Sequence, residues 1–104
     1  MRVIVDQRVN ESIQHFYQVA MLLHPSLSEE AVWNKKERLY SALFELGLYP
    51  EMYPLAKRQQ WAEHQYREVI CEDFHFAYAI CTDFDTKEQF VYIFDAVHSL
   101  LYHE

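Results

Sequence analysis

The 104 residues of this chain are enough for one domain and too few for two hydrophobic cores, so we expect a single domain over residues 1–104. Apolar residues make up 51% of the chain and aromatic residues 16%, which excludes global disorder. Sixteen acidic against nine basic residues give a formal charge of −7, which argues against a surface that grips nucleic acid as a whole. We expect no direct DNA binding by the chain alone.

Targeting and membrane signals are not found in the sequence. The segment MRVIVDQRV is too short and too charged for a signal peptide, and no stretch approaches the ~20 apolar residues of a membrane span. Cys71 and Cys81 show no CxxC spacing, and in neighbouring strands out of register they should not form a disulfide. Two buried thiols are typical of a reducing compartment. We therefore expect a cytoplasmic protein without membrane contact.

The first elements in chain order are a strand and a helix. Alternation in RVIVD indicates a short strand at 2–6. From about Val9, apolar residues recur every three or four positions, which predicts a helix capped by Asn10 and ended by Pro25. The helical stripe consists of Ile13, Phe16, Tyr17, Ala20 and His24.

A second helix is expected to begin after Ser26 or Ser28, because either side chain can cap the first free amides. We expect it to end at Gly47, the only glycine, in a left-handed conformation. Val32, Leu39, Leu43 and Leu46 form one apolar stripe, and Trp33, Tyr40 and Phe44 form a second beside it. Because this apolar arc is wide, the helix should touch both the first helix and a sheet, and the two helices should form a hairpin.

The segment 48–65 has no clean period, and its two prolines indicate a loop laid over the surface. Three aromatic residues in it, Tyr49, Tyr53 and Trp61, have two interpretations. They either pin the loop to its own domain or mark a groove for a partner, since tyrosine and tryptophan are enriched at interface hot spots.

Three strands are predicted in the rest of the chain, at 66–71, 74–81 and 90–98, joined by turns at 72–73 and 83–87. The element order is therefore β-α-α-β-β-β. This order predicts an α+β fold, with a helical hairpin packed on a mainly antiparallel sheet of about four strands.

Three short motifs carry a resemblance to a known family. ELGLYPEMYP follows the second helix, YREV opens the first of the three later strands, and VYIFDAVHS lies in the last one. Together with the element order, they resemble the RelE/ParE toxin superfamily over nearly the whole chain. The resemblance implies that the first strand lies beside the last. It also implies a toxin neutralised by a cognate antitoxin, whose C-terminal segment wraps the sheet and helices.

One branch of that family, the RelE-like members, consists of ribosome-dependent mRNA endonucleases. They stabilise charge on the scissile phosphate with Lys and Arg, and an acid or base moves the 2′-hydroxyl proton. Arg67 matches one strand arginine of this branch, and the ending Tyr102 and His103 looks like the Tyr-His ending of YoeB-type nucleases. The resemblance thus implies these three as catalytic residues if the chain is a nuclease. His75 and Ser99, however, stand where RelE-like members usually carry basic residues.

The other branch, the ParE-like members, poisons DNA gyrase by binding and needs no catalytic set. Arg67, His75 and His98 are the target-binding candidates that this branch implies, and His98 matches a final-strand histidine of many members. That histidine could either point into the site or cap the end of the sheet. The missing basic residues and the negative charge favour the ParE-like branch. A third hypothesis is a degenerate member that only binds an antitoxin.

A metal site is not expected. Zinc sites usually show close ligand pairs such as CxxC or HxxxH, and the histidines at 64, 75, 98 and 103, even with Cys71, form none. One glycine leaves no room for a phosphate-binding glycine loop. We therefore expect no cofactor.

Overall fold

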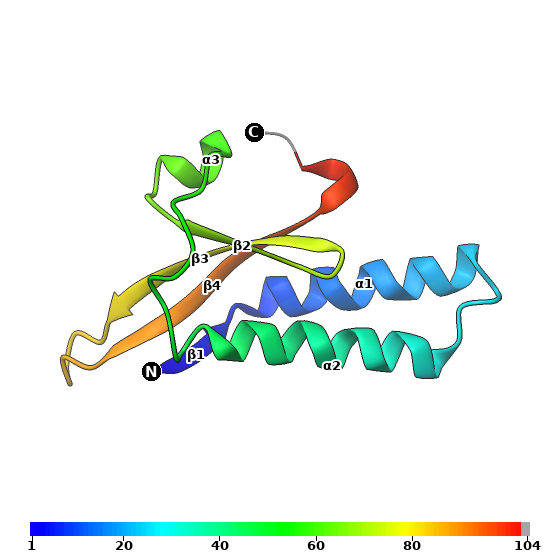
Figure 1. The fold of residues 1–104 in the computed structure, drawn as a ribbon, viewed down its shortest axis with the longest axis horizontal. Helices are drawn as coiled ribbons and strands as arrows, with labels where there is room; N and C mark the ends of the chain where they lie inside the picture. Colours follow the sequence, from blue (N-terminus) through cyan, green and yellow to red (C-terminus); the bar gives the residue numbers. More distant parts are fainter. Residues whose placement is uncertain (103–104) are drawn as a thin grey trace.

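The computed structural model describes residues 1–102 (Figure 1). In chain order its elements are β1 (Arg2–Val5), α1 (Gln7–Leu23), α2 (Glu29–Glu45), α3 (Gln59–Ala62), β2 (Arg67–Cys71), β3 (Phe74–Thr82), β4 (Gln89–His98) and the 3₁₀ helix η1 (Ser99–Leu101). The α+β class and the order β-α-α-β-β-β are confirmed, with the short α3 and η1 as additions.

The four strands form one sheet in the order β1-β4-β3-β2. β2, β3 and β4 are antiparallel neighbours, whereas β1 runs parallel to β4, with Arg2 opposite Phe90. The sheet is therefore mixed. The expectation that the first strand lies beside the last is confirmed.

Both long helices cover one face of the sheet, which we call the helix face (Figure 1). Alternation along each strand sends every second side chain to this face, where it meets the apolar stripes of α1 and α2. The buried cluster between the layers consists of Val9, Ile13, Tyr17, Val32, Leu39, Leu43, Leu46, Val69, Phe74, Phe76, Tyr78, Val91 and Ile93. This is the main core of the domain.

The start of α1 differs from the prediction, and that of α2 agrees with it. Asp6, not Asn10, caps α1, because the carboxylate at the end of β1 accepts a hydrogen bond of 2.9 Å from the Arg8 amide. Asn10 lies inside the helix and accepts a 2.6 Å hydrogen bond from the Tyr40 hydroxyl. Ser28 caps α2 as predicted, through a 3.1 Å bond from the Ala31 amide.

Gly47 does not adopt the left-handed conformation that we expected, since its φ is not positive. Glycine is needed here because the chain passes very close. A Cβ at this position would overlap the carbonyl oxygen of Met1. The Met1 amine donates a 3.0 Å hydrogen bond to the Gly47 carbonyl, so this contact joins the end of α2 to the start of β1.

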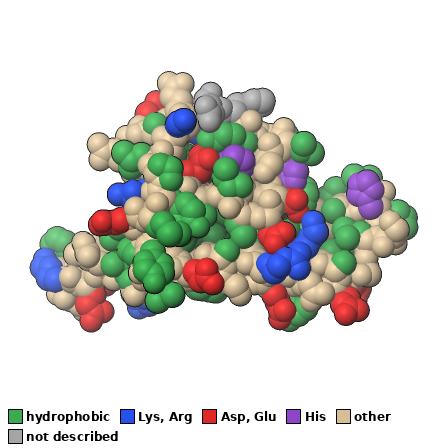
Figure 2. Space-filling view, viewed as in Figure 1, with side chains coloured by type: hydrophobic (Ala, Val, Ile, Leu, Met, Phe, Trp, Pro, Cys, Tyr) green, Lys and Arg blue, Asp and Glu red, His purple; other side chains and the backbone are tan. Residues whose placement is uncertain are grey.

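The second apolar stripe of α2 is largely uncovered, contrary to the prediction. Trp33 is 63% exposed and Phe44 is 54% exposed, and only Tyr40 packs against the core. Figure 2 shows further apolar side chains gathered over the segment that follows α2. In this segment Tyr49 is 66% exposed and so does not anchor it, contrary to one of the two interpretations.

The opposite face of the sheet carries a second, smaller core. Residues 54–66, which we call the strap, contain α3 and cross this face, which we call the strap face. Trp61 of the strap is 2% exposed and packs with Ala56 and Ala77, bordered by Tyr66, Val97 and Tyr102. Trp61 is thus an anchor, as one of the two interpretations expected. The strap also pairs with β2, because the Glu68 amide donates to the Pro54 carbonyl over 3.1 Å and Leu55 forms an antiparallel bridge with Arg67.

Candidate functional site

The residues expected to bind a target do not converge on one site. Arg67 and His98 lie on the helix face, opposite Tyr78 and Phe74 of β3 respectively. They are therefore about 13 Å apart along the sheet, with β3 between their strands. His75 lies on the strap face, since successive side chains alternate.

Arg67 holds the chain around Pro50 to Tyr53 against the sheet. Its Nη1 donates to the Tyr53 carbonyl over 2.7 Å and to the Glu51 carbonyl over 3.4 Å. Beside it, the hydroxyl of buried Tyr78 donates to the Pro50 carbonyl over 2.8 Å. Within residues 1–102 the guanidinium therefore forms no ion pair with an acidic side chain, and backbone carbonyls occupy part of its donor set.

His98 takes the second of the two roles left open for it. Its Nδ1 accepts a 3.2 Å hydrogen bond from the Leu100 amide and so caps η1. The ring stacks on Phe16 of α1, with 4.1 Å between ring centroids. His98 therefore joins the end of the sheet to α1.

Two of the predicted residues do meet, around a third that the sequence did not single out. Glu68 Oε2 lies 3.0 Å from Nδ1 of His75, and Glu68 Oε1 accepts a 2.6 Å hydrogen bond from the Tyr102 hydroxyl. The rings of His75 and Tyr102 stack with centroids 3.8 Å apart. We call these three residues the Glu68 cluster. His103 lies outside the described residues.

The register of β2 and β3 builds this cluster. The two-residue turn at 72–73 places Ile70 opposite His75 and Glu68 opposite Ala77, so Glu68 and His75 are diagonal neighbours on the strap face. The predicted turn and strands contain this information. Sequence reasoning missed Glu68 because a lone glutamate on a strand gives no signal until its diagonal partner is considered.

The Glu68 cluster borders a hollow of about 310 Å³ between the strap and β2. Tyr53, Pro54, Leu55 and Ile70 supply its apolar lining, and Lys57 is the one cation among the lining residues that the structure describes. The side chains of Glu68 and His75 are 14% and 13% exposed. A carboxylate that orients an imidazole in such a setting can support proton transfer, and a tyrosine hydroxyl can donate to an anion.

A second polar contact fixes α3 on the strap face. The Trp61 indole N–H donates to Asp95 Oδ2 over 2.9 Å, and Arg58 Nη1 lies 3.9 Å from the same oxygen. The Arg58 guanidinium also lies over the Trp61 ring, 4.9 Å from its centroid. This contact is structural, because it holds the strap to β4.

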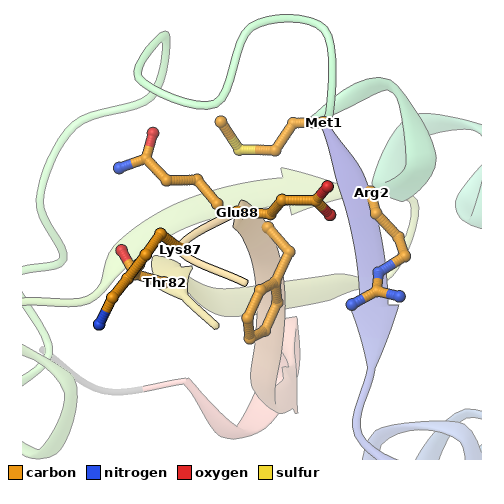
Figure 3. Close-up of a pocket in the computed structure, with 7 residues that line it drawn as sticks. Met1, Arg2, Thr82, Lys87 and Glu88 are labelled. Carbon is orange, nitrogen blue, oxygen red and sulfur yellow. The ribbon is translucent and has the colours of Figure 1, made fainter. Parts of the chain in front are cut away.

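Another hollow, with a volume of about 730 Å³, lies at the other end of the sheet, where β1 begins and the β3–β4 turn closes (Figure 3). Arg2 and Lys87 extend from opposite sides of it. Arg2 lies over the ring of Phe90 at 5.7 Å, and Lys87 over that of Phe84 at 4.8 Å. None of the predicted site residues that the structure describes lines this hollow, so it is not the candidate site.

Within residues 1–102, no group of three or more His, Cys, Asp or Glu side chains is arranged to hold a metal ion. In that same range, no helix is both long and apolar enough to cross a membrane. Cys71 and Cys81 are free thiols, and partial burial raises the pKa of each. This pKa shift makes both cysteines poor nucleophiles.

In comparisons with known proteins, the chain matches no protein-family model and shows no significant similarity to a curated protein sequence.

Proposed function

We propose that the protein is the toxin component of a type II toxin–antitoxin pair and acts, in the ParE-like manner, by binding a macromolecular target such as DNA gyrase. The toxin part rests on the three sequence motifs, and the strand order β1-β4-β3-β2 agrees with the topology that they imply. A cognate antitoxin is the second expected partner.

The observation that favours binding over catalysis is the set of hydrogen bonds that the Arg67 guanidinium makes. A phosphoryl-transfer site needs cations aimed at the charge that develops on the phosphate. The Arg67 guanidinium instead donates to the carbonyls of Tyr53 and Glu51 on the helix face, away from the Glu68 cluster. A strap face with Lys57 as the one described cation in its hollow suits a protein-binding surface better than an RNA-cleaving one.

The test is to induce the chain alone in bacteria and to follow growth, gyrase-linked DNA breaks and the 5′ ends of mRNA. We expect growth arrest with DNA breaks and without ribosome-positioned cuts. Growth arrest with ribosome-positioned cuts would indicate that the target is the ribosome and not gyrase. Normal growth at full expression would leave only the hypothesis of a degenerate member that binds an antitoxin.

The ribosome-dependent endonuclease is the second candidate, and the Glu68 cluster favours it. In this case Glu68 and His75 would move the 2′-hydroxyl proton, while Tyr102 and Lys57 would contact the phosphate. Removing such an acid–base group costs about 10²-fold to 10⁴-fold in rate. If mRNA cuts appear, Glu68→Gln should lower them at least about 10²-fold. The matched control is Glu88→Gln in the β3–β4 turn, which should leave cutting unchanged.

A further inference from the structure

The helical hairpin extends past the sheet that it covers (Figure 1). The buried residues of α1, Val9, Ile13 and Tyr17, all lie in its first two-thirds. Its last turns project beyond the β2–β3 turn, and the space-filling view shows the same projection (Figure 2). Leu22 and Leu23 in this part are 80% and 70% exposed. The second half of α1 thus presents an apolar surface that no other described element covers.

A groove lies between this part of α1 and the end of the sheet, with a volume of about 720 Å³. One wall is Phe16, Val19, Ala20 and Leu23, which share a helix face because they are spaced by three and four residues. We call the groove as a whole the elbow groove. The wall on α1 is held in place, since Phe16 packs on Phe74, with ring centroids 5.3 Å apart, as well as on His98.

The opposite wall and one end of the elbow groove differ in character. Leu100 of η1, 84% exposed, forms the apolar opposite wall. Glu72 and Asp73 of the β2–β3 turn form an acidic end. Arg38 bonds one oxygen of Glu72 over 2.8 Å, and Lys35 lies 3.3 Å from one oxygen of Asp73. Neither cation lines the groove, so the charged side chains that face an occupant there are carboxylates.

We propose that the elbow groove docks an amphipathic, net-cationic helix of a partner protein. The wall on α1 runs from Phe16 to His24, about 12 Å, which is a little over two turns of a helix laid alongside it. Apolar residues of such a helix would fill the groove as anchors, and a lysine or arginine would meet the acidic end. A second copy of this chain fits poorly, because two chains of formal charge −7 repel each other.

The docking proposal is independent of the proposed function and is tested on the purified chain. The probes are two fluorescein-labelled peptides of about 14 residues, roughly four helical turns. Both carry leucines at helical spacing of three and four, and the remaining positions are Ala and Lys in one peptide and Ala and Glu in the other. Binding is measured by fluorescence anisotropy, and the ¹⁵N-labelled chain reports the contact site by NMR.

We expect the Lys peptide to bind and to shift the amide signals of residues 16–24 and 98–101. Leu23→Asn should weaken this binding at least about tenfold, because it removes an apolar wall. Leu48→Asn is the matched control, since Leu48 and Leu23 are 71% and 70% exposed and Leu48 lies outside the groove. Glu72→Gln should reduce the preference for the Lys peptide.

Four results would overturn the docking proposal: no binding of either peptide, equal binding of both, binding that Leu23→Asn leaves unchanged, or signal changes elsewhere on the chain. Analytical sedimentation tests the other possible occupant, a second copy of this chain, by measuring whether the chain forms a dimer. A dimer whose interface contains residues 16–24 would assign the elbow groove to a second copy instead.

Discussion

Asp6 connects three elements through one carboxylate. It caps α1 through the Arg8 amide, accepts a 3.2 Å bond from the Arg8 guanidinium and a 2.8 Å bond from the Tyr92 hydroxyl of β4. The hydrogen bonds from Arg8, followed by that from Tyr92, lower the pKa of Asp6 to about 2. A charged cap at this junction therefore orients α1 relative to the sheet.

This lowered pKa predicts a defined pH dependence. The folded pKa of Asp6 is below the unfolded value of about 3.9, so its stabilisation is complete above that value and is lost as the pH falls toward 2. Asp6→Ala should lower the Tm by several degrees at pH 7, and the difference from the natural chain should shrink between about pH 4 and pH 2. Thermal melts followed by circular dichroism measure it.

The control for Asp6 is Asp85→Ala in the β3–β4 turn. The Asp85 side chain makes no hydrogen bond to any described residue, so its removal should leave Tm the same at both ends of the pH range. A Tm difference for Asp6→Ala that stays constant from pH 7 to pH 2 would contradict the assigned role.

Gly47 gives a second prediction at this scale. Gly→Ala normally stabilises a chain at a φ that alanine accepts, by about 0.4–1 kcal/mol. Here the new Cβ would overlap the Met1 carbonyl, which is backbone and cannot rotate away. We expect Gly47→Ala to destabilise by about 1–3 kcal/mol in urea unfolding, the usual cost of overpacking. Ser41→Ala, exposed on α2, should be neutral or slightly stabilising.

At the scale of elements, the strands and the two long helices could be predicted from the sequence pattern, whereas the short helices α3 and η1 could not. Period-two alternation predicted all four strands, and each predicted end lies within one residue of the observed end. The helices of the hairpin followed from their apolar stripes and from Pro25 and Ser28. α3 has only four residues, which is little more than one turn, so it has no period to detect.

The strap is an element whose stability depends on one buried side chain. Trp61→Ala should cost about 3–5 kcal/mol, because it removes a large buried ring and leaves Asp95 without its indole donor. Trp33→Ala is a matched control in the same chain, 63% exposed on α2, and should change stability by no more than about 0.5 kcal/mol. Urea unfolding followed by circular dichroism measures both. Equal losses would show that the strap does not depend on Trp61.

At the scale of the whole molecule, the fold was predictable and the candidate site only in part. His75 and Tyr102 were singled out from sequence, but as members of two different sites. What brings them together is the turn at 72–73 and the path of the chain after β4, neither of which leaves a periodic signal. Arg67 and His98 were both expected to bind the target. Sequence alternation cannot reveal that Arg67 lies opposite the middle of β3 and His98 opposite its first residue.

The exposed aromatic residues of α2 illustrate the same limit. A wide apolar arc on a helix predicts burial on two sides, but the number of neighbours available depends on how far the sheet extends beneath the helix. In this molecule the sheet ends before the hairpin does (Figure 1), and Trp33, in the second turn of α2, stays 63% exposed although its neighbour Val32 is buried in the core.

The parallel pairing of β1 with β4 has a consequence for how the chain is made. Asp6 and Tyr92, which join these strands, are 86 residues apart in sequence, so the edge of the sheet closes only after a very long loop has formed. A ribosome that is still translating the last strand therefore carries a nascent chain whose first strand has no partner. Any activity that requires the finished sheet would begin only after synthesis of that strand, and contacts over so large a sequence separation form slowly.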